Sequence, residues 1–120
     1  MTTRILQGLA WLVVGGLVLQ IYLAGAALFG LTTFQPHRTF GDALAAAILI
    51  LLVVALIARP GRRVLGLAAA LTVLTVVQIM LPSLRIELPW VAALHAVNAV
   101  ALVGVTINLA RAAPFVYRPF

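Results

Sequence analysis

Cysteine and lysine are both absent from this chain of 120 residues, and only two residues are acidic. Without cysteine there are no disulfides, iron–sulfur clusters, thiol redox relays or thiolate metal sites. Without lysine there is no Schiff base and no phosphate-loop lysine. The missing thiols exclude a thiol-dependent quinone enzyme, and no complete catalytic motif occurs elsewhere in the sequence.

Charge of either sign is scarce, because 8% of the residues are charged and 65% are hydrophobic. Soluble domains average about 45–50% apolar and about 25% charged residues. A small soluble domain buries only about two thirds of the surface that its unfolded chain exposes. So apolar a chain could not hide its surface from water, which excludes a soluble enzyme and indicates an integral membrane protein.

Four apolar stretches are long enough, or nearly so, to cross a bilayer core that needs about 20 helical residues. They cover about 5–29, 36–58, 64–81 and 89–110. Lipid offers no partner to free backbone amides, and no alternating pattern of barrel strands occurs, so the spans are expected to be helices. The short connections predict antiparallel neighbours. The expected fold is a single all-α domain over 1–120, a four-helix membrane bundle.

The eight cations, all arginine, indicate the orientation of the spans. Six of them fall on one side of the predicted membrane: Arg4, Arg59, Arg62, Arg63, Arg111 and Arg118. Arg38 and Arg85 fall on the other side, with both acids. The positive-inside rule then places both termini in the cytoplasm. The arginines form no basic face, so nucleic acid is not an expected partner. An alanine- and arginine-rich, lysine-free composition suggests a bacterial inner membrane.

An internal repeat relates the two halves of the chain at an offset of 58 residues. Gln20 precedes His37 by seventeen residues, and Gln78 precedes His95 by the same interval. Small residues follow both histidines by four, as Gly41 and Ala99. The chain is therefore expected to consist of two tandem helical hairpins that close into one bundle. Each half has an even number of spans, which makes the repeats parallel about an axis along the membrane normal.

Five polar side chains are expected in the outer half of the bilayer: Gln20, His37, Gln78, His95 and Asn98. Polar groups at this depth normally face the bundle interior or a wet cavity, and they mark a candidate functional site. The two histidines lie on non-adjacent helices, and Asn98 follows His95 by one turn on the same face.

Two imidazoles facing each other across a bundle are what a six-coordinate haem b requires. On this hypothesis His37 and His95 ligate the iron, and Gly41 and Ala99 leave room for the macrocycle. Arg38 and Arg85 lie where haem propionates would emerge. Gln20, Gln78 and Asn98 would orient the imidazoles.

A second interpretation of the same residues is that they serve packing between helices. His37 could lie among the headgroups beside Arg38, and the glutamines and Asn98 could simply link helices by hydrogen bonds. If the second and fourth helices began at one level, the two rings would differ in depth by about 7–8 Å. Shared iron ligation then requires the second helix to start further out or to tilt. A ligand other than haem is the third possibility.

The histidine–arginine pair that opens the second span, with a histidine in the fourth, resembles one four-helix half of the haem A synthase family. Residues 94–99, Leu-His-Ala-Val-Asn-Ala, are similar to a Leu-His-x-x-Asn-Ala signature of small four-span bacterial membrane proteins. The resemblance implies haem ligation by His37 and His95. That family carries a glutamate three residues before the first histidine, where this chain has Phe34. The departure argues against haem oxidation and leaves a haem-holding scaffold.

Two functions are therefore expected to compete. The first is a small b-type cytochrome or haem-holding subunit without enzymatic activity. The second is a cofactor-free accessory subunit of a larger membrane complex, with other membrane subunits or further copies of itself as partners in the bilayer. A proton-coupled transporter fits less well, because Asp42 and Glu87 lie at or near the outer interface and not deep in a span.

Overall fold

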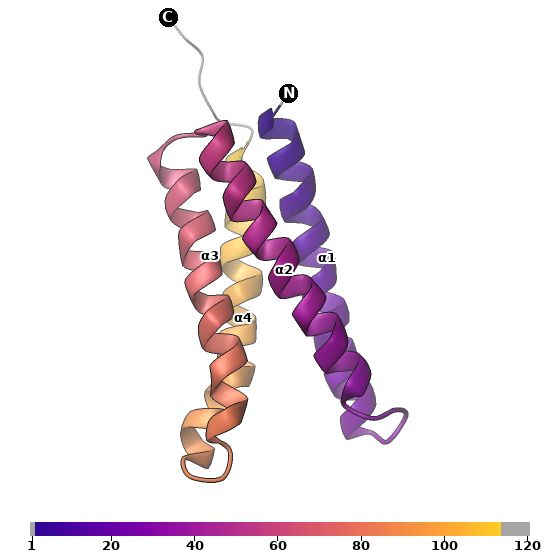
Figure 1. The fold of residues 1–120 in the computed structure, drawn as a ribbon. Helices are drawn as coiled ribbons and strands as arrows, with labels where there is room; N and C mark the ends of the chain where they lie inside the picture. Colours follow the sequence, from indigo (N-terminus) through magenta and orange to yellow (C-terminus); the bar gives the residue numbers. More distant parts are fainter. Residues whose placement is uncertain (1, 114–120) are drawn as a thin grey trace, which may run out of the picture.

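A computed structural model describes residues 2–113, and every regular element in that range is helical. The helices are α1 (Thr2–Leu28), α2 (Gln35–Ala58), α3 (Arg62–Met80) and α4 (Pro89–Ala112), with a short 3-10 helix η1 (Leu81–Leu84) directly after α3. Each of the four long helices has the length and hydropathy needed to cross a membrane. The predicted all-helical bundle of four long, apolar helices is confirmed (Figure 1). Arg118, assigned to the inner group, lies outside the described residues.

Two of the connections are tight. Between α2 and α3 the chain reverses at Arg59–Gly61, where Arg59 takes a left-handed conformation (φ 48°) and donates its N–H to the carbonyl of Ala55. Gly61 has φ 96°, which L side chains rarely adopt, so glycine suits this turn. The predicted spans leave a connection from 82 to 88 between the third and fourth helices, and the first part of this connection is helical, since η1 continues the helical path to Leu84. Pro82 has no N–H for an α-helical bond, which favours the tighter 3-10 turn there.

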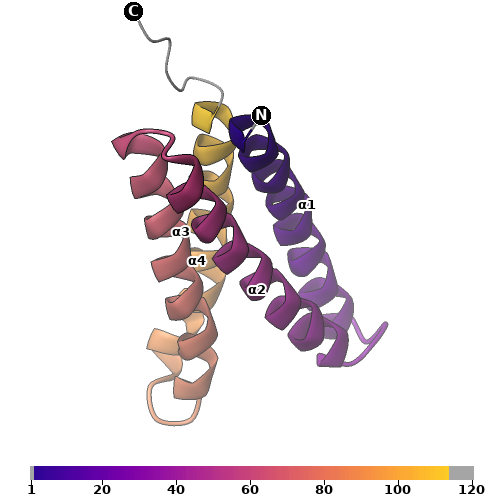
Figure 2. The same ribbon diagram turned by 45° about the horizontal axis from the view of Figure 1, so that its top comes forward.

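The helices form two antiparallel hairpins, α1–α2 and α3–α4. α1 and α3 each pack against both α2 and α4, so α2 and α4 lie diagonally across the bundle. The two hairpins diverge toward the loops that join their helices, and both ends of the described chain lie at the opposite end (Figures 1 and 2). α2 and α4 therefore face each other across the bundle, and side chains must fill the space between them.

The buried core repeats at the 58-residue offset seen in the sequence. In all four helices the core positions alternate steps of four and three residues, the spacing of left-handed bundles. Eight buried residues of the first hairpin each correspond, at this offset, to a buried residue of the second: Leu6 and Val64, Ala10 and Ala68, Val13 and Leu71, Leu17 and Thr75, Leu44 and Leu102, Ile48 and Thr106, Leu51 and Leu109, Ala55 and Ala113. The two hairpins thus use equivalent positions to build one core.

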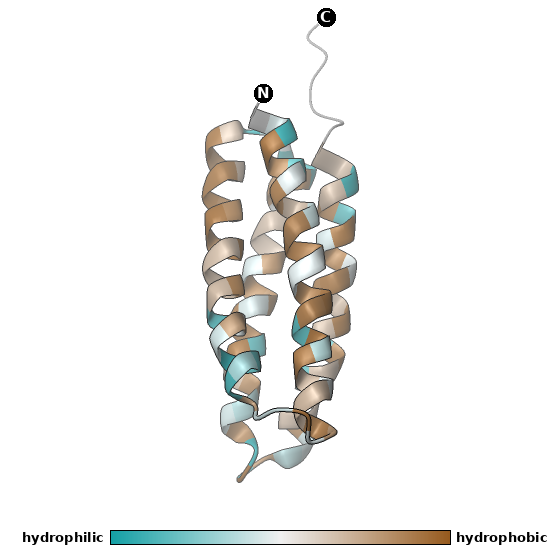
Figure 3. Cartoon of the chain, turned by 90° about the vertical axis from the view of Figure 1, so that its right-hand side faces the viewer, coloured by the Kyte–Doolittle hydropathy of each residue, from teal (hydrophilic) through white to brown (hydrophobic). Residues whose placement is uncertain are grey.

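The outer surface is apolar along most of its height. Large aliphatic and aromatic side chains are exposed on every long helix, including Leu12, Leu49, Val73 and Val100. Figure 3 shows hydrophilic segments near the helix ends and in a band toward the end that carries the 29–34 and 85–88 loops. A bilayer covers such an exterior without cost, since lipid tails are as apolar as leucine.

Candidate functional site

His37 of α2 and His95 of α4 meet between the two hairpins. Their ring centroids lie 6.2 Å apart, with 70° between the ring planes. The rings therefore cannot differ in depth by more than this distance, and the offset of about 7–8 Å that equal helix starts would give does not arise. α2 runs obliquely across the bundle in Figures 1 and 2, and this tilt is one of the two arrangements that shared ligation required.

Each repeat clamps its histidine with a glutamine. In the first repeat, His37 Nδ1 lies 3.1 Å from the carbonyl oxygen of Gln20, and Gln20 Nε2 donates to the carbonyl of His37 at 2.7 Å. This reciprocal pair joins α1 to α2. The backbone of Gln20 therefore holds the imidazole, whereas its side chain holds the histidine backbone.

In the second repeat the same pair is arranged differently. His95 Nδ1 lies 3.0 Å from the carbonyl oxygen of Gln78, but the side chain of Gln78 turns to the ring, with Nε2 3.2 Å from His95 Nε2. Asn98 Nδ2 donates both to Gln78 Oε1 (2.7 Å) and to the carbonyl of Leu74 (2.9 Å). Asn98 therefore orients His95 indirectly, through Gln78, whereas the sequence predicted that Asn98 itself would orient the imidazole.

Backbone carbonyls fix the protons in this network, because a carbonyl oxygen can only accept. Both histidines must carry their proton on Nδ1 to donate to Gln20 and Gln78. The Leu74 carbonyl likewise requires the amide nitrogen of Asn98 beside it, which leaves Gln78 Oε1 as acceptor and its Nε2 as donor. His95 Nε2 then accepts from Gln78. In the neutral form of both rings, Nε2 is then the nitrogen without a proton, the one available to a metal.

Two substitutions between the repeats explain the different glutamine positions. Asn98 corresponds to Phe40 at the 58-residue offset, and Ala99 corresponds to Gly41. With Phe40 in place of an amide donor, the buried Gln20 Oε1 has no hydrogen-bond partner among the described residues. A Cβ on Gly41 would lie 2.6 Å from Gln20 Nε2, so only glycine lets that amide reach the backbone of α2.

The two predicted arginines do not belong to this cluster. Arg38 and Arg85 are exposed near the end of the bundle that carries the 29–34 and 85–88 loops, and within residues 2–113 no hydrogen bond or ion pair connects Arg38 to the two imidazoles. Gln20, His37, Gly41, Gln78, His95 and Asn98 are all partly buried. Phe34, which departs from the family pattern, has a structural contact of its own. Its ring packs edge-on against His37, with 6.2 Å between the ring centroids. Its position three residues before His37 was the signal for this contact.

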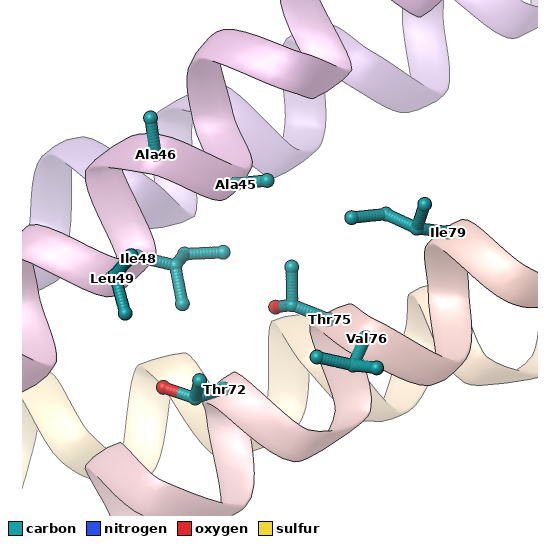
Figure 4. Close-up of a pocket in the computed structure, with 8 residues that line it drawn as sticks. All are labelled: Ala45, Ala46, Ile48, Leu49, Thr72, Thr75, Val76 and Ile79. Atoms are coloured by element: carbon teal, nitrogen blue, oxygen red, sulfur yellow. The ribbon is translucent and has the colours of Figure 1, made fainter.

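An apolar cleft of about 270 Å³ lies between α2 and α3. Figure 4 shows it between the two ribbons, with Ala45, Ala46, Ile48 and Leu49 on one side and Thr72, Thr75, Val76 and Ile79 on the other. The hydroxyls of Thr72 and Thr75 donate to carbonyls of their own helix, those of Ala68 and Leu71. The cleft walls thus suit hydrocarbon and not a polar ligand.

The donor set restricts which metals the site could hold. Across residues 2–113 no group of three or more His, Cys, Asp or Glu side chains comes together. A protein zinc site normally takes four ligands, or three with a water, and two imidazoles do not complete one. Two axial imidazoles are sufficient for haem iron, because the porphyrin supplies the other four nitrogens.

The comparisons with known proteins identify a family but no activity. Residues 20–84 match the model of DUF6220, a family of unknown function. The matched segment contains α2, α3, His37 and Gln78, and it ends before His95. No curated protein and no solved structure matches the chain.

Proposed function

The chain belongs to the DUF6220 family, and we propose that it is an integral membrane protein that binds haem b between His37 and His95. When bound, the haem supplies one-electron iron chemistry. The chain's own residues would provide both axial nitrogens and an apolar setting. The expected role is electron transfer or haem holding, without an enzymatic reaction.

The separation of the two imidazoles carries the proposal. Metal–imidazole bonds are about 2.0–2.1 Å, so two rings on one iron have centroids about 6.4 Å apart. The centroids of His37 and His95 lie 6.2 Å apart. Rotation about the bonding axis leaves this distance unchanged, so the 70° between the planes is compatible with shared ligation.

The hydrogen bonds of the imidazoles also support ligation. A metal-binding histidine almost always donates its other N–H to a carboxylate, a carbonyl or water, which fixes its tautomer and raises its basicity. The Gln20 and Gln78 carbonyls accept such bonds at 3.1 and 3.0 Å. Histidines that merely joined helices would need no common tautomer with Nε2 unprotonated.

The wider surroundings fit a porphyrin as well. The exposed Arg38 and Arg85 would meet propionates at the outer end. The resemblance of the His37–Arg38 pair, with His95 in the fourth span, to haem A synthases adds to this proposal, and Phe34 in place of the family's glutamate favours holding haem over oxidising it.

An absorption spectrum of the purified protein tests the proposal. The protein is expressed with a haem supply, purified in mild detergent, and recorded oxidised and after dithionite. We expect a Soret band and, on reduction, the sharp α and β bands of low-spin, six-coordinate haem. Colourless protein that also takes up no added haem would contradict the proposal.

We further propose a bacterial plasma membrane location with both ends of the described chain in the cytoplasm, in line with the arginine distribution. The absence of cysteine permits a direct test with single cysteines at Thr33, Ile86 and Arg62. In intact spheroplasts, a membrane-impermeant thiol reagent should label Thr33→Cys and Ile86→Cys, and label Arg62→Cys only after permeabilisation. The reverse pattern would show the opposite orientation.

A cofactor-free accessory subunit is the second candidate, favoured by the outer face of α1. Gly8 and Gly15 lie seven residues apart on that face, with no atom of the chain near the position of a Cβ. Small residues on a lipid-facing surface allow another helix to approach closely. Colourless protein that co-purifies at fixed stoichiometry with other membrane subunits would favour this candidate over haem binding.

A further inference from the structure

We infer that the two histidines are unequal ligands, with Gln78 making His95 the exchangeable one at which a small exogenous ligand enters. This inference rests on the proposed haem site and concerns its regulation. Its basis is the different use of the two glutamine side chains, which the sequence repeat alone would make equivalent.

The nitrogen with which His95 would bind iron has a hydrogen-bond partner in the structure. Gln78 Nε2 lies 3.2 Å from His95 Nε2, and Asn98 holds Gln78 in that orientation through a 2.7 Å bond to Oε1. Asn98 is itself anchored to the Leu74 carbonyl at 2.9 Å. A bond from His95 to iron must therefore replace a hydrogen bond that a fixed amide donates.

His37 has no corresponding competitor among the described residues. The amide of Gln20 is turned away from the ring and donates to the His37 carbonyl at 2.7 Å, in the space that Gly41 leaves. A His37 ring released from a bound haem would find no hydrogen-bond donor for its Nε2 among the described residues, whereas a released His95 would regain the one from Gln78. Gln78 would therefore stabilise the released form of His95, and a ligand such as carbon monoxide should enter on that side.

Replacing Gln78 by leucine tests this directly, with Gln20→Leu as the matched control from the other repeat. A typical hydrogen bond contributes about 0.5–1.5 kcal/mol, which corresponds to about 2- to 12-fold in affinity. In Gln78→Leu, haem should bind more tightly by such a factor, and ferrous haem should bind carbon monoxide more weakly by a similar factor. Gln20→Leu should neither tighten haem binding nor weaken carbon monoxide binding, because the Gln20 amide donates to the His37 carbonyl and not to the ring. Carbon monoxide binding that is unchanged or tighter in Gln78→Leu would overturn the inference.

Gly41→Ala provides a variant that removes no polar group. Its Cβ would displace the Gln20 amide from the α2 backbone and leave it free to take the orientation of Gln78, onto His37 Nε2. We expect haem to bind more weakly in this variant, by the same few-fold factor.

Ring nitrogen NMR of the haem-free protein separates this inference from the haem proposal. The Nε2 shifts of His37 and His95 should differ in the wild type and move together in Gln78→Leu. Equal shifts in the wild type would overturn the inference even if haem binds. Unequal shifts in a protein that binds no haem would uphold the difference between the rings and reject the cofactor.

Discussion

Replacing either His37 or His95 by alanine is expected to abolish six-coordinate haem. On the proposed function each variant would lose one of the two nitrogens that hold the iron, and in each a carbonyl, that of Gln20 or Gln78, also loses its imidazole donor. Removing even an outer partner of a metal ligand commonly costs about 10- to 100-fold in affinity, so loss of the ligand itself should cost at least that. The measurement is a titration with haem followed by absorbance, together with the haem content of the purified protein.

Thr75→Val serves as the control for the histidine variants. Thr75 is a buried polar residue of α3 whose hydroxyl donates to Leu71 of its own helix, away from the imidazoles. This variant should keep the wild-type spectrum and affinity. Wild-type haem content in both histidine variants would exclude the proposed ligation and leave the accessory-subunit candidate.

Enlarging a small core residue is expected to give the largest loss of stability. Ala10 and Ala68 occupy equivalent positions of the two hairpins, and both are 0% exposed. Ala68→Leu adds three carbon atoms between closely packed helices, and overpacking of this kind costs about 1–3 kcal/mol. Thermal unfolding in detergent should show a clear fall in Tm for Ala68→Leu, and a similar fall for Ala10→Leu.

The neighbouring Ala69 offers a control at the same depth. Ala69 is exposed on the outer surface of α3, where a leucine would meet only lipid or detergent. Ala69→Leu should leave the midpoint nearly unchanged. If Ala68→Leu and Ala69→Leu lowered the midpoint equally, the core built from steps of four and three residues would be wrong.

Small differences between the repeats could not be interpreted from the sequence. The sequence predicts that Gly41 and Ala99 alike leave room for a macrocycle, but in the structure the space at Gly41 holds the Gln20 amide. Asn98 was expected to orient an imidazole, and it contacts Gln78 and the Leu74 carbonyl instead. Which of several nearby partners an amide chooses depends on side-chain torsions and on the facing helix, and neither follows from spacing along the chain.

The sequence by itself determined the four spans, their short connections and the repeat of 58 residues, because a bilayer accepts only long apolar helices whose backbone groups bond internally. It also placed the glutamines and histidines near one end of the bundle, since position along a helix sets depth. Only the tertiary structure decided that His37 and His95 come within 6.2 Å of each other, because tilt and rotation about a helix axis arise from packing against neighbours. Packing also decided that one imidazole nitrogen has an amide partner whereas its counterpart in the other repeat has none among the described residues.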